Sequence, residues 1–158
     1  LIGVSMEEIS VICRNEDETV AFAQKLSQIA KVGDTFALFG TLGMGKSVFA
    51  RGFVQSLTAA EEVPSPTFTL VQSYEAPDFE IYHFDLYRLK APEEIFELGM
   101  EEALYGGVCL IEWPEKMAGW LPENCFKLTI TPDASGRRIT ISSASAEKLS
   151  RLRKLELR

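Results

Sequence analysis

The stretch that most constrains this chain is GTLGMGKS, residues 40–47, which directly follows the apolar run TFALF. It matches the pattern G-x-x-x-x-G-K-[ST] at every fixed position. Glycines let the backbone curl so that successive N–H groups point into one hollow, and the next helix adds its positive end to this anion site. In such a loop Lys46 reaches the β- and γ-phosphates and the Ser47 hydroxyl binds Mg²⁺. A random chain of this length matches the pattern only about once in two hundred.

The residues around this loop alternate between strand and helix patterns. Strands are predicted at 8–13, 35–39, 69–75, 79–88, 107–113, 125–130 and 137–142. Helices are predicted at 17–31, 46–57 and 92–104, and 145–158 is either a charged helix or a tail. Short links predict hairpins at 76–78 and 132–136. The sequence therefore predicts one α/β domain over residues 1–158.

The composition limits the class of protein. The net charge is -7, opposite to that of most free-standing nucleic-acid binders, so a partner is expected to supply any basic surface. Three cysteines with no CxxC spacing indicate neither a disulfide framework nor a zinc site, which fits the cytoplasm. No apolar run has transmembrane length, and no membrane association is expected. Residues 1–10 are too short and acidic for a signal peptide, and Met6 is a candidate start.

Two acidic residues are candidates to complete a metal site. In P-loop proteins such an acid usually ends a neighbouring strand. Asp85 lies late in EIYHFDLYR, and Glu112 ends VCLIE. An acid in this position is poorly placed for core packing but well placed at the sheet edge where ligands bind. Each also fits an ordinary surface carboxylate, and the sequence leaves open which of the two dominates a metal site.

Four other side chains each allow two interpretations. Thr67 follows two prolines, in the order expected of a switch threonine in a nucleotide hydrolase, but it also fits a turn. His83, the single histidine, is expected to be a packed or edge residue rather than a catalytic base. Arg88 is expected to pair with an acid on the following helix rather than with phosphate. Trp113 either lines the pocket or packs in the core.

Four motifs together resemble one family. They are GTLGMGKSVFARGF, SPTFTLVQSY, YHFDLYRL and GGVCLIEWPEK, in this order between residues 40 and 116. The chain from about Glu16 to Arg138 resembles the bacterial TsaE (YjeE) ATPases. Those proteins act in making threonylcarbamoyladenosine beside the anticodon of tRNAs. The last three motifs are far less generic than the phosphate loop, which makes the resemblance specific.

The resemblance implies a P-loop NTPase fold of three layers, with parallel central strands and antiparallel flanking strands. It implies ATP and ADP as ligands, together with Mg²⁺. Lys46, Asp85 and Thr67 would act in turnover, and Ser47 with Glu112 would flank the metal. The residues implied to contact the nucleotide are Gly43, Met44, Gly45, Lys46, Ser47, Val48, Trp113, Glu16, Glu115 and Arg137.

The resemblance also implies a partner. The enzyme that transfers the threonylcarbamoyl group in this system is a complex of TsaB and TsaD, which a TsaE protein would bind and reset by hydrolysing ATP. We therefore expect an ATP hydrolase that is weak alone and stimulated by a TsaB–TsaD-type complex. It would meet tRNA only indirectly, through that complex.

Two other functions fit a P-loop. A small-molecule kinase is the main alternative, but it usually needs a basic lid, and residues 114–136 contain few basic side chains, Lys116 and Lys127. Phosphate appearing on an added metabolite would favour it. A switch protein that binds ATP without hydrolysis is the other alternative, and tight binding without turnover would favour it.

The chain departs from the family pattern inside the loop. Relatives usually carry an acid where this chain has Thr41, which removes a negative charge beside the phosphates. Met44 replaces a typical alanine and is expected to crowd the loop mouth. Ser47 replaces a typical threonine but keeps the hydroxyl that binds metal. The first two changes put the rate of turnover in doubt.

Overall fold

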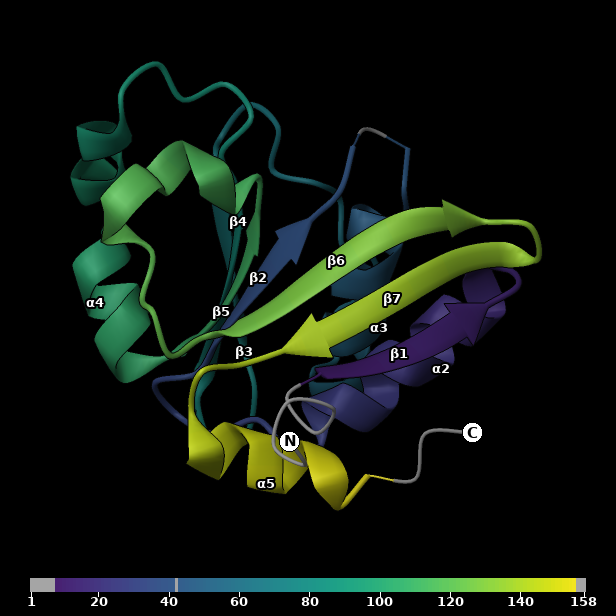
Figure 1. Ribbon diagram of the computed structural model, residues 1–158. Coiled ribbons are helices and arrows are strands. Elements are labelled where there is room, and N and C mark those ends of the chain that lie inside the picture. Colours follow the sequence, from purple (N-terminus) through teal and green to yellow (C-terminus); the bar gives the residue numbers. More distant parts are fainter. Residues whose placement is uncertain (1–7, 42, 156–158) are drawn as a thin grey trace.

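The computed structural model describes residues 8–41 and 43–155, and these residues form a seven-stranded sheet (Figure 1). The order of the strands across the sheet is β1-β7-β6-β2-β5-β4-β3. The expected start at Met6, the other residues before 8, Leu42 of the glycine-rich loop and residues 156–158 lie outside the described residues. The strands are β1 (Glu8–Cys13), β2 (Thr35–Phe39), β3 (Val71–Glu75), β4 (Glu80–Asp85), β5 (Val108–Glu112), β6 (Phe126–Asp133) and β7 (Gly136–Ser142).

The sheet is parallel in its centre and antiparallel at its sides. Strand β2 pairs in parallel with both β5 and β6, and β4 pairs in parallel with β5. Strand β3 joins β4 as an antiparallel hairpin, and β7 joins β6 in the same way, with β1 antiparallel beyond it. Both predicted hairpins are therefore confirmed, as is the α/β class with parallel central strands.

Helices cover the sheet on both faces, which gives three layers. Helices α2 (Glu16–Ser27), α3 (Lys46–Leu57) and α5 (Ala146–Arg153) contribute to the larger apolar cluster. The 3-10 helices η1 (Pro92–Leu98) and η2 (Pro114–Trp120) and the helix α4 (Met100–Gly106) contribute to the second cluster. Along β5, Leu110 belongs to the larger cluster and Ile111 to the second, because successive side chains of a strand point to opposite faces. Figure 1 shows α4 on one side of the sheet and α3 on the other.

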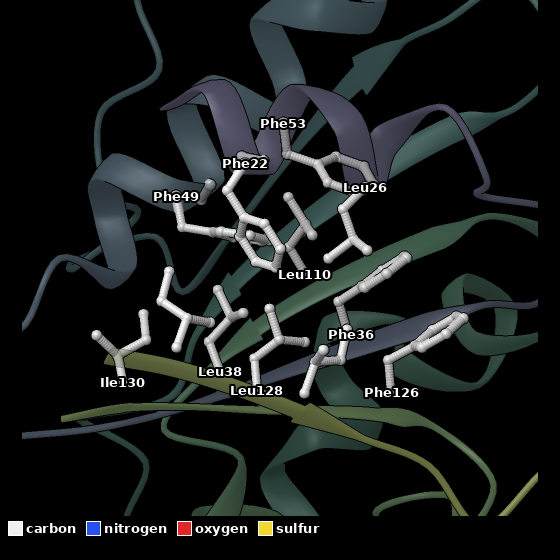
Figure 2. Close-up of a cluster of buried hydrophobic side chains, with 14 of the residues drawn as sticks. Phe22, Leu26, Phe36, Leu38, Phe49, Phe53, Leu110, Phe126, Leu128 and Ile130 are labelled. Carbon is white, nitrogen blue, oxygen red and sulfur yellow. The ribbon is translucent and has the colours of Figure 1, made fainter. Parts of the chain in front are cut away.

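Aromatic side chains dominate the larger cluster. Figure 2 shows Phe22, Phe49 and Phe53 of the helices above the aliphatic and aromatic side chains of the sheet. The ring of Phe36 on β2 stacks on Phe126 of β6 with centroids 4.7 Å apart. It also meets Phe53 of α3 at 5.0 Å. Phe36 therefore fixes the helix that begins at the glycine-rich loop against the strand that leads into that loop.

Two of the predicted helices differ from the structure, one by a break and the other at both of its ends. The predicted helix over 92–104 is broken at Gly99, whose φ of 76° is left-handed, so a 3-10 segment ends there and α4 begins. Helix α2 ends at Ser27 rather than at residue 31, because the Lys31 N–H binds the Asp34 carboxylate and starts a turn. The helix also begins at Glu16, one residue before its predicted start, because the Asn15 side chain caps it by accepting a hydrogen bond from the Glu18 N–H.

Within the predicted segment 145–158, residues Ala146–Arg153 form the helix α5, so this part is a helix rather than a tail. Arg151 of α5 donates from both terminal nitrogens to the two oxygens of Asp34, at 2.7 and 2.9 Å. Asp34 lies just before β2, and both side chains are buried. Such two-pronged pairs are among the stronger ionic contacts in proteins. The pair therefore holds α5 against the start of the central strand.

Replacing Phe36 by alanine tests this core. We expect Phe36→Ala to lower the free energy of unfolding by about 3–5 kcal/mol, because it leaves a cavity between two rings. The matched control is Phe68→Ala, since Phe68 is 81% exposed; it should cost less than about 1 kcal/mol. Urea unfolding followed by circular dichroism measures both. Equal losses would contradict this account of the core.

Candidate functional site

A cavity of about 670 Å³ lies where the carboxyl ends of β2, β4 and β5 meet the start of α3. Ligands of open parallel sheets bind at this edge because loops leave the strands there. The glycine-rich loop and α3 line it with Gly43, Met44, Gly45, Lys46, Ser47 and Val48. Elements distant in the sequence add Glu16, Thr67, Asp85, Glu112, Trp113 and Arg137. Apart from Glu115, all of the predicted site residues line this one cavity.

Two glycines of the loop occupy positions that a side chain would disturb. Gly45 caps α3 with a φ of 99°, a left-handed value that a side chain rarely tolerates. Gly40 lies so close to β6 that an added Cβ would sit 2.9 Å from the carbonyl oxygen of Ile130. The cavity thus faces a helix N-terminus, where backbone N–H groups and the helix dipole favour an anion.

Lys46 lines the cavity and is only 4% exposed. Its ammonium donates to the carbonyl oxygen of Gly40 at 2.6 Å. The same Nζ lies 3.6 Å from the ring centroid of Trp113, within range of a cation–π contact. These two contacts hold the ammonium beside the loop, although neither partner carries a negative charge.

The two candidate acids are direct neighbours in the sheet. Asp85 and Glu112 end adjacent parallel strands and pair in register, and they are 6% and 3% exposed. The Ser47 hydroxyl lies 3.4 and 3.5 Å from the two carboxylate oxygens of Glu112. Geometry therefore places Glu112, rather than Asp85, beside the hydroxyl that the loop pattern assigns to a metal.

Asp85 is bound to a different part of the site. Its Oδ2 accepts from the Ser65 hydroxyl at 2.8 Å, and its Oδ1 accepts from the Tyr87 N–H at 3.1 Å. The Asp85 N–H also donates to the carbonyl oxygen of Leu70. The segment that contains Thr67 is thus tied to Asp85 from both sides. Sequence reasoning missed Ser65, although it stands in the same motif as Thr67.

Trp113 lines the pocket and also packs against the second apolar cluster, so both of its interpretations apply. Its backbone is left-handed with a φ of 59°, unusual for a large residue and a frequent sign of a functional position. The Trp113 ring meets the ring of Tyr87 at 4.9 Å and covers Lys46. Tyr87 itself is half exposed and also lines the cavity.

Of three more predicted residues, two line the cavity and one does not. Arg137 of β7 donates to the carbonyl oxygen of Gly43 at 3.3 Å and lines the cavity. Glu16 lines the cavity from the start of α2 and lies 3.7 Å from Arg51. Glu115 is exposed and does not line the cavity, although its negative charge acts to raise the pKa of Lys46.

Two side chains outside the predicted site have unexpected contacts. His83 is fully buried, as predicted for a packed residue, and its Nε2 lies 2.6 Å from Oε2 of Glu112. The predicted ion pair of Arg88 with the following helix is wrong: in the part of the chain that the structure describes, Arg88 forms no such pair. Its guanidinium lies 4.8 Å from the ring of Phe68, because β4 has already ended and the chain has turned before the helix begins.

Comparison with known proteins places the chain in a family. The model of the family "Threonylcarbamoyl adenosine biosynthesis protein TsaE" matches residues 13–140. The chain belongs to the TsaE family. The TsaE protein of Rickettsia bellii is 44% identical over 128 residues, which cover 80% of this chain and 89% of that protein. The TsaE protein of Rickettsia felis is 49% identical over 106 residues, which cover 66% of this chain but only 62% of that protein.

A solved structure agrees with this assignment. The crystal structure of Bacillus subtilis YdiB matches with a TM-score of 0.72 and 30% identity, over 93% of this chain and 95% of that one. The resemblance found in the motifs is therefore confirmed, and so is the TsaE role in threonylcarbamoyladenosine biosynthesis as the family's function. No helix among the described residues is long and apolar enough to cross a membrane.

The charges around Lys46 lead to a test. Burial lowers the pKa of Lys46, and the carboxylate of Glu112 opposes this more than the other acids do. Because that carboxylate favours the charged ammonium, Glu112→Gln should lower the pKa of Lys46 further. The ¹³Cε signal of Lys46, followed against pH by NMR and assigned by its loss in Lys46→Arg, measures the change. Glu123→Gln, an exposed acid outside the cavity, is the control; an unchanged or higher pKa in Glu112→Gln would contradict this electrostatic account.

Proposed function

We propose that this chain is a Mg²⁺-dependent ATPase that acts with a TsaB–TsaD-type complex in the biosynthesis of threonylcarbamoyladenosine in tRNA. The observation that carries the proposal is the meeting of Lys46, Ser47 and Glu112 in one cavity at a helix N-terminus. Membership of the TsaE family supplies the tRNA-modification context. We treat the sheet and its helices as a single ATPase domain.

The residues fit a nucleotide phosphate. Lys46 is nearly buried, yet its ammonium donates only to a carbonyl oxygen and contacts a ring, and both are weak partners for a full charge. A phosphate in the cavity would give this ammonium and the loop N–H groups a charged partner, and charge-assisted hydrogen bonds are about twice as strong as neutral ones. Gly43, Met44, Gly45 and Val48 line the same wall, and we assign them to the phosphate chain. Arg137, Trp113 and Glu16 line the remainder, which we assign to the nucleoside.

The residues also fit Mg²⁺ bound through a nucleotide. Among the described residues, no group of three or more His, Cys, Asp or Glu side chains is arranged to hold a metal on its own. Mg²⁺ usually takes only one or two protein ligands and completes its shell with water and substrate phosphates. We assign Ser47 and Glu112 to this role because their side chains lie 3.4 Å apart. Bound there, Mg²⁺ would neutralise charge that develops on the phosphates.

Asp85 and Thr67 are assigned to turnover. Both line the cavity, and Asp85 is tied to the segment of Thr67 through Ser65. Asp85 has a carboxylate that can orient a water molecule and accept its proton as that water attacks the terminal phosphorus to give ADP and phosphate. We expect Thr67 to move with this segment between the ATP-bound and ADP-bound states.

The surface charge supports action through a partner. A chain with a net charge of -7 is poorly suited to hold tRNA alone, so we expect it to meet tRNA through the complex. The three free cysteines, all buried, fit the reducing cytoplasm, where we place this activity. Thr41 is exposed at the loop, and Met44 lines the cavity while its side chain also packs partly against the core.

Phosphate release from ATP tests the proposal. We expect slow release by the pure chain with Mg²⁺, and clear acceleration when a purified TsaB–TsaD complex is added. Fast turnover alone, or no response to the complex, would contradict a partner-dependent ATPase. Phosphate appearing on an added metabolite would indicate a kinase instead.

Lys46→Ala tests the phosphate site through the affinity for MgADP, measured by calorimetry. A hydrogen bond to a charged group contributes about 1.5–3 kcal/mol, so the variant should bind MgADP about 10- to 100-fold more weakly. Lys127→Ala removes an exposed lysine of β6 outside the cavity and should leave binding unchanged. Equal binding by Lys46→Ala and the unaltered chain would contradict the phosphate site.

A further inference from the structure

His83 is a buried polar residue to which the proposed mechanism assigns no role. It is the single histidine of the chain and has no exposed surface. Along β4, His83 and Asp85 share a face because side chains alternate, and Leu110 and Glu112 share the corresponding face of β5. His83 pairs in register with Leu110, so Glu112 lies diagonally across from it. This placement brings Nε2 of His83 to within 2.6 Å of Oε2 of Glu112.

The second ring nitrogen shows which tautomer the site requires. Nδ1 of His83 is buried and has no hydrogen-bond partner among the described residues. A proton on Nδ1 would be a buried donor without an acceptor, which costs more than an unused lone pair. The proton therefore belongs on Nε2, where it is donated to the carboxylate of Glu112. The imidazole thus donates one hydrogen bond, from Nε2 to Glu112, the proposed metal ligand.

This hydrogen bond restrains a carboxylate that has a competing partner. The ammonium of Lys46 lies near enough for the charge of Glu112 to act on its pKa. No ion pair joins the two in the part of the chain that the structure describes, where Lys46 donates to Gly40 instead. With Oε2 held by His83, both carboxylate oxygens stay within 3.5 Å of the Ser47 hydroxyl. Lys46 is thereby left available for phosphate.

We propose that His83 is a positioning residue that holds the Glu112 carboxylate toward Ser47 and so sets the affinity of the site for nucleotide-bound Mg²⁺. The inference rests on the proposed function, because it needs Mg²⁺ at Ser47 and Glu112. His83 itself touches neither nucleotide nor metal, since it does not line the cavity. Partners that orient a metal ligand typically change metal affinity or activity by about 10- to 100-fold when they are lost.

Two substitutions of His83 by side chains of the same length separate its hydrogen bond to Glu112 from its packing in the core. In His83→Gln the amide nitrogen is as many bonds from Cα as Nε2 of histidine, so a donor to Glu112 is kept. In His83→Met the same place is taken by a methyl group, which fills the core without donating. We expect His83→Met to raise the Mg²⁺ concentration for half-maximal ATP hydrolysis by about 10- to 100-fold. His83→Gln should stay close to the unaltered chain.

ADP binding in the absence of metal separates the two roles of His83. If His83 only supported the packing of the core, its loss would weaken this binding as well. ADP binding in EDTA, measured by calorimetry, should be the same in His83→Met, His83→Gln and the unaltered chain, because Lys46 and the loop are untouched. Glu112→Ala is the reference for a complete loss of the Mg²⁺ response. Equal Mg²⁺ dependence in His83→Met and the unaltered chain would overturn the inference alone. If the unaltered chain shows no Mg²⁺ dependence, the proposed metal site fails and the inference fails with it.

NMR tests the hydrogen bond without any activity. A single histidine gives one pair of imidazole ¹⁵N signals, so no assignment is needed. We expect a protonated Nε2 and an unprotonated Nδ1, with the Nε2 signal shifting in Glu112→Ala. A proton on Nδ1, or no shift in that variant, would overturn the inference even if ATP hydrolysis is confirmed.

Discussion

The parallel pairing of β2, β5 and β4 is the constraint on which the rest of the site depends. Parallel strands end at the same edge, so the glycine-rich loop after β2, Glu112 on β5 and Asp85 on β4 are brought together there. The register makes this specific, because Leu38 and Asp85 both pair with Glu112. A shift of one residue in either pairing would turn the side chain of Glu112 or Asp85 to the opposite face of the sheet relative to its neighbours. The aromatic packing around Phe36 stabilises this register from one face, and the smaller cluster with Met100 and Met117 stabilises it from the other.

Several charged groups are buried at that edge, and each is compensated in part. Lys46 and Glu112 are less than 5% exposed, a costly state for charges without partners. Glu112 accepts from His83, whereas Lys46 has only a carbonyl oxygen and a ring. The site thus holds the Lys46 ammonium in place without a negatively charged partner in contact with it. A cavity of this kind favours a phosphate because its donors are already oriented and little further ordering is needed on binding.

The sequence predicts the fold's centre well because that part follows local rules. A fixed loop pattern, short apolar strands and acids at strand ends suffice to place Lys46, Ser47, Asp85 and Glu112 at one edge. What the sequence did not predict depends on contacts between distant segments or on the backbone conformation of a single residue. The bond from His83 to Glu112 is diagonal between two strands and needs their register, and the break at Gly99 needs a backbone value that composition alone does not give.

The central claim is that the cavity at this edge binds a magnesium nucleotide through Lys46, Ser47 and Glu112. A crystal structure of the chain with ADP and Mg²⁺ tests it most directly. We predict the diphosphate in the glycine-rich loop, the Lys46 ammonium moved from the Gly40 carbonyl to a phosphate oxygen, and Mg²⁺ bound to the Ser47 hydroxyl on the side of Glu112. Nucleotide bound elsewhere, or in the loop with Lys46 still on Gly40 and no metal beside Ser47, would contradict the account.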